Sequence, residues 1–412
     1  MSRCARSTSD RTSSSAARNC SGARNATARS AMREAPARER IPGGSHERIF
    51  GLDVMRATAI ALVVFAHSSS LLSSPEGSLY WFPRIDGVDL FFVLSGFLVG
   101  GLLLRAPLNG AEGWHRHLLD FWQRRWLRTL PNYFVFLLIN ILLVRWGLAP
   151  GLISEATVAY VVFLQNFHLP FDLFFWESWS LAVEEWFYLL FPMLLTGLVL
   201  LARTRYDRAF LITALVFCAA PILTRIGALQ QVTSAAELDL FVRKLVITRL
   251  DAIGIGALAA WAMKALPHVW MRSRWPLFIA GLLVLSWASE HRPAPSDPIP
   301  NALYFSLIPL SIGCLVPLLS SWRSDHLITR PIAFVSRIAY ALYLVHMPML
   351  YLFQHKSSSL PDPSVSLALY YWSACLLIST VVLHTVELPF MRLRDRVGER
   401  IHGAYERPLT PP

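Results

Sequence analysis

The chain has 412 residues, of which 54% are hydrophobic and only 16% are charged. A soluble globular domain carries about 25% charged residues, so this composition excludes an ordinary soluble protein. The formal net charge of +11 does not indicate a nucleic-acid partner, because no basic stretch alternates with exposed aromatic residues as a nucleic-acid groove requires.

Residues 1–46 are rich in Ser, Ala and Arg and have almost no large apolar side chain. Such a segment cannot bury enough apolar surface to fold, so we expect a disordered cytoplasmic tail. An organellar transit peptide has a similar composition and is the alternative, and Met32 is a second candidate for the start of the chain. The remainder divides into a membrane domain at residues 47–392 and a cytoplasmic tail at 393–412.

The membrane domain contains apolar runs close to the ~20 residues that a helix needs to cross about 30 Å of hydrocarbon. A shorter run at 156–169 ends in polar residues, so we expect a re-entrant or interfacial segment there, with an eleventh span as the alternative. The fold is therefore predicted to be all-α, a polytopic membrane bundle of about ten transmembrane helices. The ten runs lie at 52–72, 87–104, 129–146, 181–201, 209–226, 248–265, 275–290, 301–320, 333–353 and 366–386.

Basic residues indicate how the bundle is oriented. If the N-terminus is inside, the inner loops and the C-terminal tail hold most of the Lys and Arg, and the outer loops hold few. This is the positive-inside pattern, and it predicts that both termini lie in the cytoplasm.

The first span carries two ionisable residues, Arg56 and His67. They are 11 residues apart, which places them on one helical face about 16 Å apart along the axis. Ionisable groups inside a membrane are costly and are therefore functional candidates. The alternative is an arginine that reaches the interface and a histidine that only hydrogen-bonds a neighbouring helix.

The next two predicted helices add candidates of opposite charge. Asp89 and Ser95 lie within the apolar run of the second span. Arg124, Arg125 and Arg128 precede the third span at its cytoplasmic end, and guanidinium groups so arranged suit bidentate phosphate recognition. Ordinary positive-inside charge would also explain these arginines.

Later spans carry further polar residues. Glu184 and Glu185 lie about two turns inside the membrane, at a depth that His67 could match. Arg249 and Asp251 are close in sequence and are a candidate structural ion pair.

Tyr340, Tyr343 and His346 recur at three-residue steps on one face of the ninth span. They are candidates for contacts with a substrate inside the bundle. The five cysteines show no metal-ligand spacing, so we expect no metal site.

Seven motifs follow one another in order along residues 48–392: Arg56-x10-His67, GVDLFFVLSGF at 87–97, RWLR at 125–128, WSLAVEEWFYLLFP at 179–192, RLDAIGIG at 249–256, SRIAYALYLVH at 336–346 and ELP at 387–389. With these motifs, residues 48–392 resemble the acyltransferase-3 family of polytopic membrane acyltransferases. The resemblance implies transfer of an acyl group, usually acetyl from cytoplasmic acetyl-CoA, to a hydroxyl of a surface glycan or secreted metabolite, in a bacterial inner membrane. The residue after Glu184 varies in the family, so Glu185 inherits less from the resemblance. The short tail leaves no room for the periplasmic hydrolase-like domain of some members.

These observations lead to a set of expected roles. His67 is expected to be the general base, assisted by Arg56, Glu184 and Asp89 as the other catalytic residues. The expected ligands of the acyl-CoA phosphates are Arg124, Arg125 and Arg128, and the expected substrate-binding residues are Ser95, Glu185, Tyr340, Tyr343 and His346.

Two functional questions stay open at this point. Transfer could be direct or could pass through an acyl-histidine. A proton- or solute-coupled transporter is the alternative function, although the sequence lacks the matching halves that transporters usually show. A structural scaffold would not explain so many ionisable residues in the spans.

Overall fold

The computed structural model describes residues 48–71, 86–105, 114–230, 232–324, 326–357 and 365–405. The tail predicted at residues 1–46 lies outside the described residues. The chain separates into two units, Met1–Arg48 and Ile49–Pro412, and the helices described below belong to the second unit.

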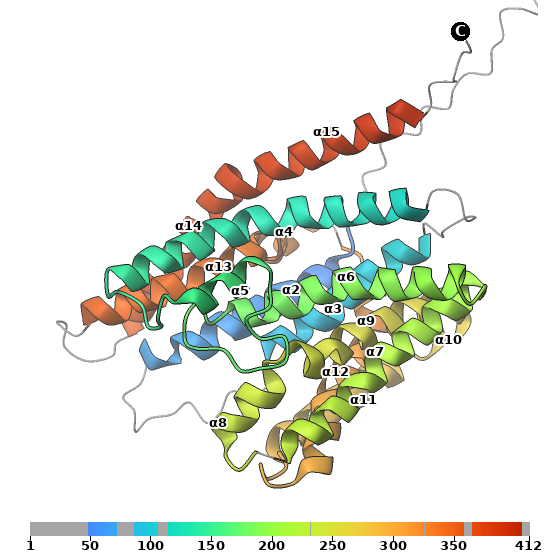
Figure 1. Cartoon of the computed structure of the whole chain (residues 1–412), viewed down its shortest axis with the longest axis horizontal. Helices are drawn as coiled ribbons and strands as arrows, with labels where there is room; N and C mark the ends of the chain where they lie inside the picture. The colour runs from blue at the N-terminus through green and yellow to red at the C-terminus, as the bar shows by residue number, and fades with distance from the viewer. Residues whose placement is uncertain are drawn as a thin grey trace, which may run out of the picture. The chain divides into compact units, whose positions relative to one another are not determined.

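The second unit is built from helices, and no β-strand occurs among the residues that the structure describes. This confirms the predicted all-α fold class. The α-helices are α2 (Phe50–Ser68), α3 (Gly87–Arg105), α4 (Trp114–Arg145), α5 (Val158–Val161), α6 (Ser178–Leu200), α7 (Tyr206–Leu229), α8 (Ala235–Leu238), α9 (Val246–Ala265), α10 (Pro267–Arg272), α11 (Arg274–Glu290), α12 (Pro298–Ser321), α13 (Arg330–Ser357), α14 (Val365–Val382) and α15 (Leu388–Tyr405) (Figure 1). Short 3-10 or π-helical turns connect several of them, namely η1 (Ser69–Leu71), η2 (Glu155–Thr157), η3 (Asp239–Arg243), η4 (Leu327–Thr329) and η5 (Leu383–Glu387).

Within the described ranges, nine helices are long and apolar enough to cross a membrane, as a polytopic bundle requires. They coincide with nine of the ten predicted runs. The remaining run, 275–290, forms α11, which has 17 residues and lies at the short end of the range for a spanning helix.

The segment predicted to be re-entrant or interfacial does not form an eleventh long helix. Its only α-helix, α5, has four residues. The polar residues at its end instead bind other backbone segments: the Asn166 amide donates to the carbonyl oxygens of Trp179 (3.0 Å) and Lys244 (2.6 Å). This segment therefore joins the beginnings of α6 and α9, which are far apart in sequence.

Two glycines allow α3 and α9 to pack with their backbones in contact. A Cβ atom at Gly96 would lie 1.9 Å from the Ile253 carbonyl oxygen, and one at Gly256 would lie 2.1 Å from the Val93 carbonyl oxygen. Only glycine fits such a crossing. The close crossing also brings the polar residues near the N-termini of the two helices together.

Helices from distant parts of the chain pack together around one internal space. α13 packs against α2, α4 and α14, and α3 packs against α2, α6 and α9. The end of α14 continues through η5 into α15, which lies along α4 (Figure 1). As a result, residues of α2, α3, α4, α6, α13 and η5 can face one internal space.

Candidate active site

An internal cavity lies between these helices. Its empty volume is about 910 Å³, including the space that is open to solvent. Seven of the residues predicted from the sequence line it: Arg56, Ser95, Arg125, Arg128, Glu184, Tyr340 and Tyr343. Five predicted residues are not part of its lining: His67, Asp89, Arg124, Glu185 and His346.

Four of the residues that line the cavity are arginines, and the part of the cavity that they line is called here the arginine end. They are Arg56 on α2, Arg125 and Arg128 on α4, and Arg337 on α13. Arg337 received no role in the sequence analysis, although it lies in the SRIAY motif. The concentration of fixed positive charge makes this end suited to bind an anion with several phosphate groups.

Neighbouring side chains hold the arginines in place. Arg56 donates to the Ser336 hydroxyl (3.2 Å), and Ser336 donates to Asp53 (2.6 Å). The Arg125 guanidinium lies over the rings of Phe121 (5.9 Å) and Tyr188 (5.8 Å).

Arg124 differs from its neighbour Arg125. Its side chain is half exposed and pairs with Asp120 at 2.9 Å. Consecutive helical residues point about 100° apart, so the two arginines cannot share one face. Arg124 therefore lies outside the cavity, although its charge is in the same helical turn.

Glu184 on α6 lines the cavity. The Tyr188 hydroxyl donates to its carboxylate (2.9 Å), and the Tyr188 and Ser95 hydroxyls are 2.6 Å apart. This network joins α3 to α6. Tyr188 could have been proposed from the sequence, because it lies four residues after Glu184 and therefore on the same helical face.

Glu185 points away from this network, toward α4. One of its carboxylate oxygens accepts a hydrogen bond from Thr129 (2.7 Å), and the other has no hydrogen-bond partner. Tyr340 donates to the Thr129 carbonyl (2.7 Å), so Thr129 links α4 to both α6 and α13.

Tyr343 on α13 also lines the cavity. Its hydroxyl lies 2.6 Å from the Ser180 hydroxyl and 3.0 Å from the Glu177 carbonyl oxygen. Its ring lies 5.5 Å from the ring of His346. Tyr343 therefore connects the lining of the cavity with His346, which does not line it.

His67 and His346 form a pair, called here the histidine pair, with their ring centroids 5.1 Å apart. Nδ1 of His67 is 2.8 Å from the Val63 carbonyl oxygen, and Nδ1 of His346 is 2.5 Å from the Tyr343 carbonyl oxygen. A carbonyl oxygen can only accept, so each Nδ1 is assigned the hydrogen and each Nε2 keeps a lone pair. Nε2 of His346 is buried without a hydrogen-bond partner.

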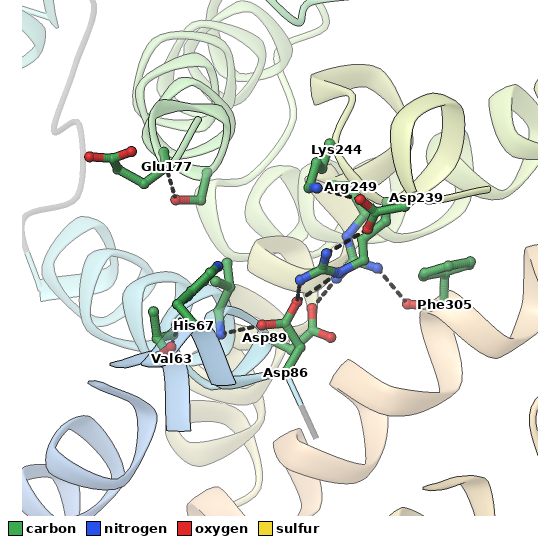
Figure 2. Close-up of polar contacts among 12 residues, drawn as sticks. Val63, His67, Asp86, Asp89, Glu177, Asp239, Lys244, Arg249 and Phe305 are labelled. Carbon is green, nitrogen blue, oxygen red and sulfur yellow. Dashed lines mark hydrogen bonds and ion pairs between the residues drawn. The ribbon is translucent and has the colours of Figure 1, made fainter. Parts of the chain in front are cut away.

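An ion cluster lies beside His67 (Figure 2). Arg243 pairs with Asp86 and, at 2.6 Å, with Asp239, while Lys244 also pairs with Asp239. Arg243, Asp86 and Lys244 are the charges that act on His67. Burial alone would raise the pKa of Asp86, but Arg243, the Val88 N–H and Arg249 together hold that pKa below its usual range. His67 thus borders a group of fixed charges that do not line the cavity.

Asp89 pairs with Arg249, which is buried (Figure 2). The expected pair between Arg249 and Asp251 is wrong, because Asp251 binds Arg225 at 2.5 Å instead. Residues two positions apart point to opposite sides of a helix, so Arg249 and Asp251 pair with residues on two different helices, α3 and α7. Asp89 therefore faces α9 rather than the cavity.

Glu177 precedes α6 and received no role in the sequence analysis. Its side chain is buried, and neither carboxylate oxygen has a hydrogen-bond partner. Burial raises its pKa to about 8. Figure 2 shows the carboxylate directed away from the ion cluster.

In the described part of the chain, no three or more His, Cys, Asp or Glu side chains come close enough together to hold a metal ion.

Comparison with known proteins gives one family and several relatives. The family model described as an acyltransferase domain, acyltransferase 3, matches residues 49–384. A Bacillus subtilis protein named "Putative peptidoglycan O-acetyltransferase YrhL" is 26% identical over 330 residues, which are 74% of this chain and 49% of that protein. The "O-acetyltransferase OatA" of Staphylococcus aureus is 33% identical over 162 residues, 36% of this chain and 25% of that protein. The chain thus spans half or less of the length of these relatives, and no solved structure matches it significantly.

Proposed function

We propose, from the premise that the chain belongs to the acyltransferase-3 family, that it is a membrane O-acetyltransferase. Its donor would be acetyl-CoA from the cytoplasm, and its acceptor a hydroxyl group of a cell-surface glycan. The names of the relatives support this reaction, since they are called O-acetyltransferases and one name specifies peptidoglycan. We place the protein in a bacterial inner membrane with both termini in the cytoplasm.

The observation that carries the proposal is a cavity that is lined by four arginines and that contacts the histidine pair through Tyr343. The arginine end supplies charge for the phosphates of coenzyme A. Along α2, the 11 residues from Arg56 to His67 correspond to about 16 Å. A donor whose phosphates are held at the arginine end could extend its pantetheine arm, and so its thioester, toward Tyr343.

His67 would act as the general base. Its Nε2 lone pair takes the proton of the acceptor hydroxyl, and the hydroxyl oxygen attacks the thioester carbonyl carbon. The carbon–sulfur bond then breaks, and the proton passes to the departing thiolate to give free coenzyme A. An acyl group carried first by His67 is the other route by which the same bonds form and break.

The remaining candidates have supporting roles in this proposal. Arg125 and Arg128 bind the donor phosphates, and Arg56 and Glu184 complete the polar lining of the donor path. Arg124, half exposed in the same turn, attracts the donor to the entrance.

The hydroxyl groups would orient the substrates. Ser95, Tyr340 and Tyr343 line the path. Tyr343 would exchange its hydrogen bond to the Glu177 carbonyl oxygen for one to the thioester carbonyl oxygen as negative charge develops there. His346 supports His67 through the ring contact. Glu185 holds α4 through Thr129, and Asp89 holds α3 against α9.

The test uses purified protein in liposomes in one orientation. Radiolabelled acetyl-CoA is supplied at the arginine end and a glycan acceptor only in the opposite compartment. The expected result is labelled acceptor without free acetyl-CoA crossing the membrane, and no label with His67→Ala. Flux of a solute down or against a gradient, without acylation and with no need for the donor, would identify a transporter and overturn the proposal.

A further inference from the structure

Glu387 is a buried carboxylate for which no role has been assigned so far. It lines the cavity, its side chain is only 5% exposed, and its Oε2 atom has no hydrogen-bond partner. The residue belongs to the ELP motif noted in the sequence, but nothing in the spacing of that motif indicated a ligand.

A π-helical turn brings Glu387 to the cavity. The turn η5, Leu383–Glu387, interrupts the long helix formed by α14 and α15, and Glu387 is its last residue. Such turns widen a helix locally and occur often at functional sites. η5 contacts both α4 and α13, which carry Arg128 and Arg337 respectively.

The charges around Glu387 define what its carboxylate can bind. Arg128 and Arg56 are the charges that act on it, which places it at the arginine end. A carboxylate repels phosphate, so it cannot be a phosphate ligand there. A buried acceptor without a partner costs free energy, and a ligand group that donates a hydrogen bond would remove that cost.

We propose that Glu387 is a recognition residue for the acyl-CoA donor and accepts a hydrogen bond from one of its hydroxyl or N–H groups. This inference rests on the proposed function. The arginines bind the phosphates of the donor, and Glu387 distinguishes the donor from a simple polyphosphate, which has no such group to offer. The residue is thus a determinant of specificity at the arginine end, with no part in the chemical step.

The experiment measures two affinities in detergent-solubilised protein by calorimetry. The ligands are acetyl-CoA and inorganic pyrophosphate, and the variants are Glu387→Ala and Glu387→Gln. Glu290→Ala, an exposed acid at the end of α11, is the matched control. Wild type is measured first, because failure to bind acetyl-CoA at all would contradict the proposed function before Glu387 is tested.

Replacing Glu387 is expected to change the affinities for the two ligands differently. Glu387→Ala should weaken acetyl-CoA binding about 10-fold, as expected for the loss of a hydrogen bond to a charged group. The same change should leave pyrophosphate binding equal or tighter, because a negative charge has been removed. Glu387→Gln retains an acceptor oxygen, so acetyl-CoA binding should stay within about threefold of wild type while pyrophosphate binds more tightly.

Two other outcomes would overturn the inference. If both ligands bind more tightly to either variant by the same factor, Glu387 acts only as a nearby charge. If both bind more weakly, or the melting temperature falls, its role is structural. In acylation assays of the folded Glu387→Ala variant, the KM for acetyl-CoA should rise about 10-fold.

Discussion

Replacing Asp89 with asparagine removes the charged partner of a guanidinium that is enclosed within the bundle. The Arg249 side chain is 1% exposed and that of Asp89 is 8% exposed. The other contacts of Arg249 are a 3.3 Å hydrogen bond to the Phe305 carbonyl oxygen and the Phe305 ring 5.4 Å away, and its Nε has no partner. The neutral amide of the variant cannot balance the positive charge that remains.

The size of the effect follows from that burial. Removing one partner of a buried ion pair costs about 3–5 kcal/mol, because it leaves an uncompensated charge. At about 2 °C per kcal/mol for a large chain, Asp89→Asn should lower the melting temperature by roughly 6–10 °C. The double variant Asp89→Asn/Arg249→Gln, which removes both charges, should recover most of the loss.

Thermal unfolding in detergent is the assay, with acylation measured on the folded protein at low temperature. Asp207→Asn is the control, because its pair with Lys264 is exposed (62% and 47%) and worth at most about 1 kcal/mol. If Asp89→Asn melts like wild type but loses acylation, the structural reasoning fails and Asp89 has the catalytic role that the sequence predicted.

Three further expectations follow from the site. His67→Ala should insert at near-normal abundance and lose acylation at least 10²-fold in membranes; substantial remaining activity would exclude it as the base. Arg125→Ala and Arg128→Ala should each weaken acetyl-CoA binding and spare acceptor binding, with Lys rescuing only in part; equal loss of both affinities would indicate misfolding. The pKa of Glu177 is raised to about 8, so the folded state retains a proton that the unfolded state has lost, and stability should fall as pH rises from about 4.5 toward 8. Glu177→Gln should abolish that fall in the melting temperature measured against pH, whereas an unchanged slope would rule out Glu177 as its source.

Much of the fold could be predicted from the sequence because the length of a spanning helix is a local property. The apolar runs near 52–72 and 87–104 became α2 and α3 with small shifts of their ends. The short run at 156–169 was correctly separated from the spans, since its length and its polar end do not suit hydrocarbon. The orientation from the basic loops stays a prediction.

The candidate site could be predicted only as a set of residues. Helical periodicity gives the relative direction of two residues on one helix, as for Tyr340 and Tyr343, which both line the cavity. It does not give the rotation of that helix within the bundle. For this reason the sequence could not decide that Glu184 faces the cavity while Glu185 faces α4.

By itself, the sequence determined that the chain is a helical membrane protein with the acyltransferase-3 motifs. The length of an apolar run and the spacing of a motif depend only on the order of the residues along the chain. The tertiary structure alone decided which charges meet. Asp89 and Arg249 are 160 positions apart, and their pairing depends on the glycine crossing of α3 and α9. Likewise, Glu387 reaches the arginine end only because a π-helical turn and the packing of α14 place it there. Contacts of this kind depend on how several helices rotate and pack together, which no single segment specifies.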